Sequence, residues 1–200
     1  MPVPPYNNPR GFTPSGHLTG NFSPSMRRRR TNGRNLRTLR VGDPVYLDAN
    51  GDVQRALVAT AVGQQWIGVI GMLFNENGRP LQGALPSALA ASTVGFAGVY
   101  EDPFIIYTVH SSAAVGDATV GLFANIAYQN TGTAAGISSC SLADDFTATS
   151  IGHPLKVIGV SRNLLEENAS GTARNDVEVI ITQHKWLGRG RAILVEEHAA

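Results

Sequence analysis

The sequence predicts a mostly β protein: a compact β-barrel or β-sandwich domain with a long extended N-terminal arm and a short C-terminal extension. Two observations favour strands, because the 200 residues include 22 glycines and the apolar residues occur in short runs separated by turn-forming residues. A third observation divides the chain, since the first 42 residues hold eight arginines and no acidic residue. We therefore expect an arm at 1–40, a body domain at 41–186 and an extension at 187–200.

The body is expected to begin with a β-hairpin. Two short runs of alternating apolar residues flank the pair Asn50-Gly51. Asn-Gly is the favoured pair for a type I′ turn, which requires a positive φ at both central residues. Asp48 and Asp52 superficially match a calcium-binding loop, but Val53 occupies the position that requires glycine, so we expect no calcium there.

Further strands are predicted where apolar residues alternate with other residues or run continuously. These strands are expected at 66–74, 104–110, 118–126, 154–160 and 176–184. The stretch 80–98 stays open between one helical turn at 85–91 and an irregular strand at 89–99. The apolar run at 192–195 is expected to form an edge strand that pairs with a neighbour's sheet.

The N-terminal 40 residues favour an extended conformation. Six of the eleven prolines lie between positions 2 and 24, and proline excludes this segment from a helix or a central strand. An extended chain of this length reaches on the order of 130 Å, enough to cross a neighbouring subunit. A solvated tail without fixed structure is the alternative interpretation of the same composition.

Isolated aromatic residues and arginines of the arm are the candidate partner-binding residues. Arginine pairs with carboxylates and with phosphates, so both a protein and a nucleic acid are candidate partners. The lack of stacking aromatics between the arginines favours a protein partner, as does the acidic body, which holds all fifteen acidic residues. The candidate residues are Tyr6, Phe12, Phe22, Arg27, Arg28, Arg29, Arg30, Arg34, Arg37 and Arg40.

The usual signatures of enzyme chemistry are missing from the sequence. No phosphate-binding loop, dinucleotide fingerprint, nucleophile elbow or zinc-protease motif occurs in it. Cys140 is the single cysteine, so no intrachain disulfide can form, and the five histidines are scattered. We therefore expect no catalytic residue, no cofactor, no metal site and no small-molecule substrate. No apolar run approaches the ~18 residues of a membrane helix, so no membrane partner is expected either.

Several body segments follow one another in a characteristic order. They are 39–48 with its Asn-Gly hairpin, 101–110, a loop rich in glycine, serine and alanine, 154–160, and the closing strand 177–185. In this combination the chain resembles the head cement or decoration proteins of tailed bacteriophages, which are small β-rich proteins of the outer shell. The resemblance implies a virion structural protein that binds the major capsid protein and forms a homo-oligomer, a trimer or a dimer.

The expected function is capsid stabilisation by a protein on the outer surface of the phage head, assembled in the host cytoplasm. The arm would bridge neighbouring major capsid protein subunits, with the stability supplied by contact area and multivalency. The alternative is a coat protein of a small icosahedral virus whose arginine-rich arm binds the packaged genome. A third class, a β-barrel enzyme of the cupin type, would require a bound metal.

Overall fold

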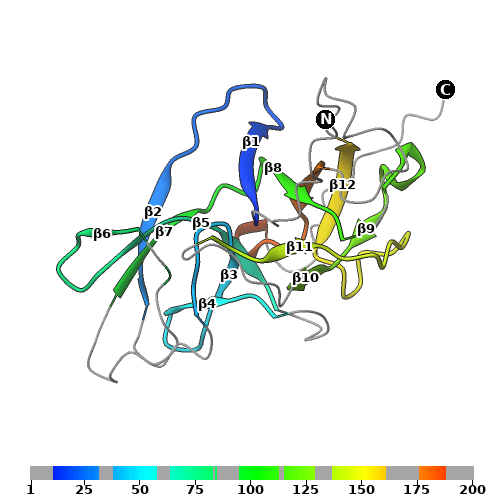
Figure 1. Ribbon diagram of the computed structural model, residues 1–200. Coiled ribbons are helices and arrows are strands. Elements are labelled where there is room, and N and C mark those ends of the chain that lie inside the picture. Colours follow the sequence, from blue (N-terminus) through cyan, green and yellow to red (C-terminus); the bar gives the residue numbers. More distant parts are fainter. Residues whose placement is uncertain are drawn as a thin grey trace, which may run out of the picture.

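The computed structural model describes residues 11–31, 38–57, 64–82, 84, 95–112, 115–128, 137–160 and 176–187 (Figure 1). In this part of the chain the regular structure consists of strands and two short 3-10 helices, η1 (Asp117–Thr119) and η3 (Lys185–Leu187). All the strand pairs are antiparallel apart from isolated bridges. The prediction of a mostly β fold is therefore confirmed.

Thirteen strands are defined in the described residues. They are β1 (Thr13–His17), β2 (Met26–Thr31), β3 (Pro44–Leu47), β4 (Val53–Arg55), β5 (Trp66–Phe74), β6 (Pro80–Leu81), β7 (Gly95–Tyr100), β8 (Ile105–His110), β9 (Phe123–Ala124), β10 (Ile126–Tyr128), β11 (Cys140–Leu142), β12 (Leu155–Val160) and β13 (Asp176–Ile181). One large sheet has the order β1-β8-β13-β12-β9, and the other has the order β2-β7-β5-β3-β4 with β6 beside β5. Strands β10 and β11 form a small third sheet.

Most body strands form where the apolar periodicity predicts them. The strand expected at 66–74 is β5, and those expected at 104–110, 154–160 and 176–184 correspond to β8, β12 and β13. The strand expected at 118–126 differs, because a 3-10 turn and then Gly121, with a φ of 91°, interrupt the extended chain before β9. Part of the open stretch 80–98 forms β6 and β7, whereas the helical turn considered at 85–91 lies outside the described residues.

The hairpin around Asn50-Gly51 joins β3 to β4. Leu47 pairs with Val53, so the connection is longer than a two-residue turn. The Asp48 carboxylate stabilises this loop, since Oδ1 accepts the backbone N–H groups of Asn50 and Asp52, both at 2.9 Å. The hairpin is therefore confirmed, with a side-chain carboxylate holding its loop.

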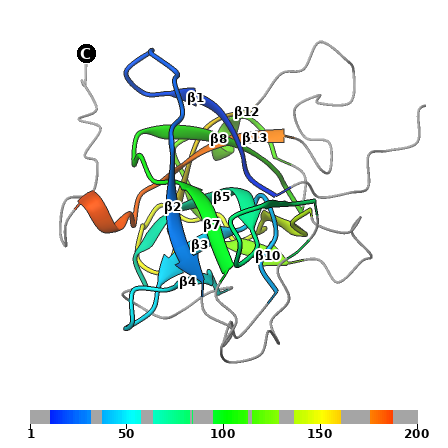
Figure 2. The ribbon, with the colours of Figure 1, turned by 90° about the vertical axis from the view of Figure 1, so that its left-hand side faces the viewer.

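The arm expected at 1–40 differs from the structure in its described part, because two of its segments are strands of the body's own sheets. Thr13–His17 pairs antiparallel with β8, and Met26–Thr31 pairs antiparallel with β7. Strand β1 thus becomes the edge of the sheet that contains β8, and β2 becomes the edge of the sheet that contains β7 (Figure 2). Proline and arginine are compatible with edge strands, which leave one side of the backbone unpaired.

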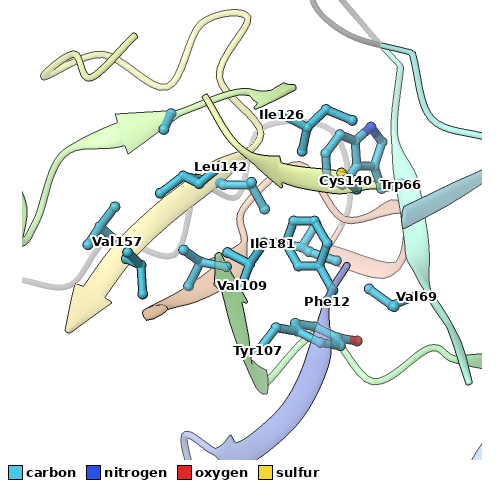
Figure 3. Close-up of a cluster of buried hydrophobic side chains, with 14 of the residues drawn as sticks. Phe12, Trp66, Val69, Tyr107, Val109, Ile126, Cys140, Leu142, Val157 and Ile181 are labelled. Atoms are coloured by element: carbon cyan, nitrogen blue, oxygen red, sulfur yellow. The ribbon is translucent and has the colours of Figure 1, made fainter. Parts of the chain in front are cut away.

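The first hydrophobic core lies between the β1-β8-β13-β12-β9 sheet, the start of β5 and the small sheet (Figure 3). Its members include side chains from many strands, among them Trp66, Tyr107, Leu142 and Ile181. A second core of eight residues lies within the other large sheet. Its members are Leu39, Val45, Val53, Ile67, Ile70, Leu73, Ala97 and Val99.

The β2-β7-β5-β3-β4 sheet is strongly curved. Its two edge strands, β2 and β4, lie in contact, although no backbone pairing joins them in the described residues. The arrangement is therefore an open sheet rolled around its own core, and the two large sheets together are sandwich-like. This curvature places the arginines of β2 beside residues of the β3–β4 hairpin.

Candidate docking surface

The four consecutive arginines of β2 differ in their surroundings. Successive residues of a strand point to opposite faces, so neighbouring arginines meet different groups. Arg29 and Arg30 form ion pairs with carboxylates of the body, and Arg28 stacks on aromatic rings. The Arg27 side chain is exposed and makes no hydrogen bond or ion pair with the described residues, although its backbone lies in the β2–β7 ladder. The four arginines therefore divide into two that are ion-paired within the protein and two whose charge has no carboxylate partner among the described residues.

Arg29 binds Glu101, which follows directly after β7. Nε donates to Oε1 and Nη2 donates to Oε2 at 2.6 Å, which makes a bidentate pair. The Glu101 side chain is only 5% exposed, and the pairing raises the pKa of the Arg29 guanidinium. The guanidinium also lies 5.9 Å from the ring of Trp186, an aromatic residue that is half exposed.

Arg30 binds Asp52, which precedes β4. Nε donates to Oδ1 at 2.5 Å and Nη2 donates to Oδ2 at 3.2 Å. The Asp52 side chain is buried, so Arg30 supplies the positive charge that compensates this carboxylate where β2 and β4 meet. Two of the arginines that the sequence assigns to a partner are thus neutralised within the chain itself.

Arg28 lies over two aromatic side chains, one on the neighbouring strand β7 and one on β5, the strand beyond it. Its guanidinium carbon is 3.9 Å from the centre of the Phe96 ring and 5.6 Å from that of Phe74. Phe74 and Phe96 are cross-strand partners on β5 and β7, so the two rings form one aromatic surface. No described residue accepts a hydrogen bond from the Arg28 guanidinium, which remains exposed.

The connection between β1 and β2 presents apolar side chains to solvent. Leu18, Phe22 and Met26 are each 40% to 43% exposed, and Phe104 is 39% exposed. The backbone N–H of Leu18 donates to the carbonyl oxygen of Phe104 at 3.0 Å, which places these two side chains on neighbouring segments. Residues 18–25 contain no charged side chain and project from the body in both views (Figures 1 and 2).

Phe12 is not available to a partner, although the sequence places it with the candidate anchors. Its side chain is 2% exposed and meets the Tyr107 ring edge-on at a centroid distance of 6.1 Å (Figure 3). Gly11 precedes Phe12 and has a φ of 68°. A side chain is excluded at this position, because a Cβ there would lie 2.6 Å from the carbonyl oxygen of Gly42. Phe12 therefore stabilises the fold.

The other candidate residues of the arm divide into two groups. Tyr6, Arg34 and Arg37 lie outside the described residues. Arg40 precedes the β3–β4 hairpin, where its backbone N–H donates to Oδ2 of Asp43 at 2.8 Å. Its side chain is half-buried, so Arg40 belongs to the body rather than to an exposed arm.

A buried polar cluster lies beneath the start of β3. Ser138 Oγ donates to Asp43 Oδ1 at 2.5 Å, and the backbone N–H of Cys140 donates to Ser138 Oγ at 3.0 Å. Burial raises the pKa of Asp43 to about 6, and it also raises the pKa of the Cys140 thiol. A thiol that is buried and resists ionisation is a poor nucleophile, so this cluster is suited to holding the fold together.

The described histidines do not converge on one site. His17, His110 and His153 each lie beside a different aspartate, at 3.1, 3.0 and 3.4 Å. His184 is buried, which lowers its pKa to about 4. Among the described residues no group of three or more His, Cys, Asp or Glu side chains could hold a metal ion. In the same residues no helix is long and apolar enough to cross a membrane.

The sequence reasoning missed the body residues that complete this surface. Phe96 and Phe104 lie in or next to turns and glycine-rich stretches, and Trp186 follows the last strand. Phe96 and Trp186 lie outside any predicted periodic run, whereas Phe104 begins the run 104–110, whose periodicity predicts a strand and not an exposed side chain. Four consecutive arginines in a strand must divide between its two faces, but the sequence does not show which groups each face meets, because their partners lie far along the chain.

Comparisons with protein-family models, with curated proteins and with solved structures found no match for this chain. The function is therefore inferred from the surface and from the order of the sequence segments.

Proposed function

We propose that the protein is a capsid cement or decoration protein, which binds the outer surface of a tailed-phage head and bridges neighbouring major capsid protein subunits. The observation that carries the proposal is the projecting, uncharged segment 18–25, with exposed apolar side chains on it and beside it. The order of the body segments, which resembles that of such proteins, supports the same function.

Contact area is the proposed mechanism of stabilisation. Exposed side chains such as Leu18 and Phe22 lose contact with water when they fill shallow pockets of a partner. Because only 42% to 43% of each is exposed in the free protein, burying the rest contributes roughly 1 kcal/mol per side chain. Gly20, with a φ of 84°, turns the chain directly after β1, where its backbone N–H donates to the carbonyl oxygen of His17 at 2.9 Å. A homo-oligomer multiplies these contacts, so weak individual contacts produce strong attachment.

The internal ion pairs count against the alternative of a genome-binding coat protein. Nucleic-acid affinity increases with the number of phosphates that arginines and lysines neutralise. Arg29 and Arg30 already pair with Glu101 and Asp52, so within the described residues Arg27 and Arg28 are the arginines of β2 whose guanidinium groups have no carboxylate partner. Apolar side chains beside two free charges are better suited to a protein surface than to a phosphate backbone.

The proposal is tested with heads that lack this protein, assembled from the major capsid protein of the same genome. Purified wild-type protein is added and its occupancy and the disruption temperature of the heads are measured. We expect saturable binding and a higher disruption temperature, both reduced in the double variant Leu18→Ser/Phe22→Ser. Ile151→Ser is the matched control, because Ile151 is 75% exposed but lies in a distant turn.

Two results would contradict the proposal. Wild-type protein that does not bind the heads would exclude the capsid function. Retention on the packaged genome with a steep dependence on salt concentration would indicate the nucleic-acid function instead.

A further inference from the structure

The stack beneath Arg28 holds its guanidinium in a defined place before any partner binds. The Phe96 ring lies 3.9 Å below the guanidinium carbon, and the Phe74 ring is 5.6 Å away. The turn at Gly78 borders the same group, since a Cβ at Gly78 would lie 3.0 Å from Nη2. Stacking on aromatic rings orients a planar guanidinium and leaves its edge free for hydrogen bonds.

The hydrogen-bonding capacity of Arg28 is unused within the described part of the chain. Arg29 and Arg30, its neighbours, donate to both oxygens of a carboxylate. Arg28 makes no such bond with a described residue and is exposed. A guanidinium with a fixed plane and free donors matches the planar carboxylate group, which accepts two parallel hydrogen bonds.

We propose that Arg28, held on Phe96 and Phe74, is a preformed docking point for a carboxylate of the partner protein. The inference deepens the proposed function and rests on it for the identity of the partner, the major capsid protein. The partner residue is an aspartate or glutamate that lies next to an apolar contact, because Met26, two positions before Arg28, is 40% exposed.

Charge favours a protein carboxylate over a nucleic-acid phosphate at this place. The two arginines that follow Arg28 in β2 are already paired, Arg29 with Glu101 and Arg30 with Asp52, so the free positive charge at this place is small. One stacked arginine is enough to bind a single carboxylate, whereas strong binding of nucleic acid needs several free cations in a row.

The first test measures direct recognition of the charged group. The side-chain Nε–Hε signals of ¹⁵N-labelled protein are followed by NMR during titration with hexaglutamate and, separately, with a short oligothymidylate. We expect hexaglutamate to shift the Arg28 signal, with smaller changes at Arg29 and Arg30. No shift at Arg28 would overturn the inference, and so would a stronger response of Arg28 to the oligonucleotide.

The second test measures attachment to the heads described above. Arg28→Gln is expected to weaken binding about tenfold, because it removes a charge-assisted bidentate hydrogen bond. Arg79→Gln is the control of equal charge change, since Arg79 is exposed in the neighbouring turn, and it is expected to change binding less than about twofold. Phe96→Leu keeps the charge but removes the main ring of the stack, and is expected to give an intermediate loss.

The outcomes separate this inference from the proposed function. Wild-type protein that binds heads while Arg28→Gln binds equally well would overturn only the role of Arg28. Wild-type protein that does not bind would overturn the proposed function first. Melting temperatures of the variants are compared, so that a loss of binding with an unchanged melting temperature is assigned to the contact itself.

Discussion

The guanidinium of Arg29 and the carboxylate of Glu101 form a bidentate ion pair between residues 72 positions apart in the sequence. Arg29 lies on edge strand β2, and Glu101 follows its neighbour β7. Because the Glu101 side chain is almost fully buried, this pair ties the arginine-rich segment to the body. The basic segment is thus a structural element as well as a surface.

Loss of one partner of this pair is expected to destabilise the fold. Arg29→Met leaves the Glu101 carboxylate buried without its counter-charge, which we expect to cost about 2 kcal/mol. This value is below that of a fully buried pair, since Arg29 keeps partial exposure. Urea unfolding of Arg29→Met, Glu101→Gln and the double variant measures the coupling. A double variant whose destabilisation equals the sum of the two single effects would show that the pair contributes nothing.

Phe12 and Phe22 are expected to respond differently to the same substitution. Phe12→Ala removes a buried ring and is expected to lower the free energy of unfolding by about 3–5 kcal/mol. Phe22→Ala removes an exposed ring, so stability should change by less than about 0.5 kcal/mol while binding to heads decreases. Thermal unfolding and head occupancy of both variants check this contrast. Equal destabilisation by the two substitutions would contradict the assigned positions.

Gly68 of β5 is expected to tolerate no side chain. Its φ is 139°, and a Cβ there would lie 1.7 Å from the carbonyl oxygen of Tyr100. Gly68→Ala is therefore expected to cost about 3 kcal/mol or more. Gly121→Ala is the matched control, because its φ of 91° is also positive but nothing lies within 4 Å of the added Cβ, and it should cost about 1 kcal/mol. Similar melting temperatures for the two variants would disprove the close approach.

Two buried groups are expected to make opposite contributions to the pH dependence of stability. The pKa of Asp43 is raised from 3.8 to about 6, so its contribution is complete below pH 3.8 and is lost as the pH rises to 6. The pKa of His184 is lowered from 6.5 to about 4, so its contribution is complete above pH 6.5 and is lost as the pH falls to 4. Each change amounts to about 3 kcal/mol, and the two nearly cancel between pH 4 and 6.

Single substitutions should reveal each contribution. Asp43→Asn leaves the histidine, so stability should decrease as the pH falls from 6.5 to 4. His184→Gln leaves the aspartate, so stability should increase as the pH falls from 6 to 4. Urea unfolding of both variants and the wild type across this range provides the measurement. Parallel profiles for all three proteins would contradict the assignment.

The body strands could be predicted from sequence because their signal is local. The apolar residues within 66–74 and 176–184 indicate a strand by themselves, whatever other elements these segments contact. The strands in the arginine-rich segment could not, because β2 is stabilised by Phe96, Glu101 and Asp52, which lie far along the chain. The residue types of β2 have no preference for a strand, so the strand forms because of these long-range contacts.

The candidate surface was predictable in composition but not in detail. Phe12 and Phe22 are both isolated aromatic residues among glycine and polar neighbours, so the sequence does not distinguish the buried one from the exposed one. The same is true of the four arginines, whose partners depend on which face of β2 each one occupies. Among the described residues of the predicted set, Phe22, Arg27 and Arg28 remain exposed candidates for partner contact, and Tyr6, Arg34 and Arg37 stay predictions outside the described residues.

Hydrogen exchange of the isolated protein tests most directly whether the arginine-rich segment belongs to the fold before any partner binds. The amides of Met26–Thr31 that pair with β7 are predicted to exchange nearly as slowly as those of Gly95–Tyr100. The same protection is predicted for the paired amides of Thr13–His17. Exchange of both segments at the rate of an unstructured peptide, while β7 and β8 stay protected, would contradict the structure and restore a free arm.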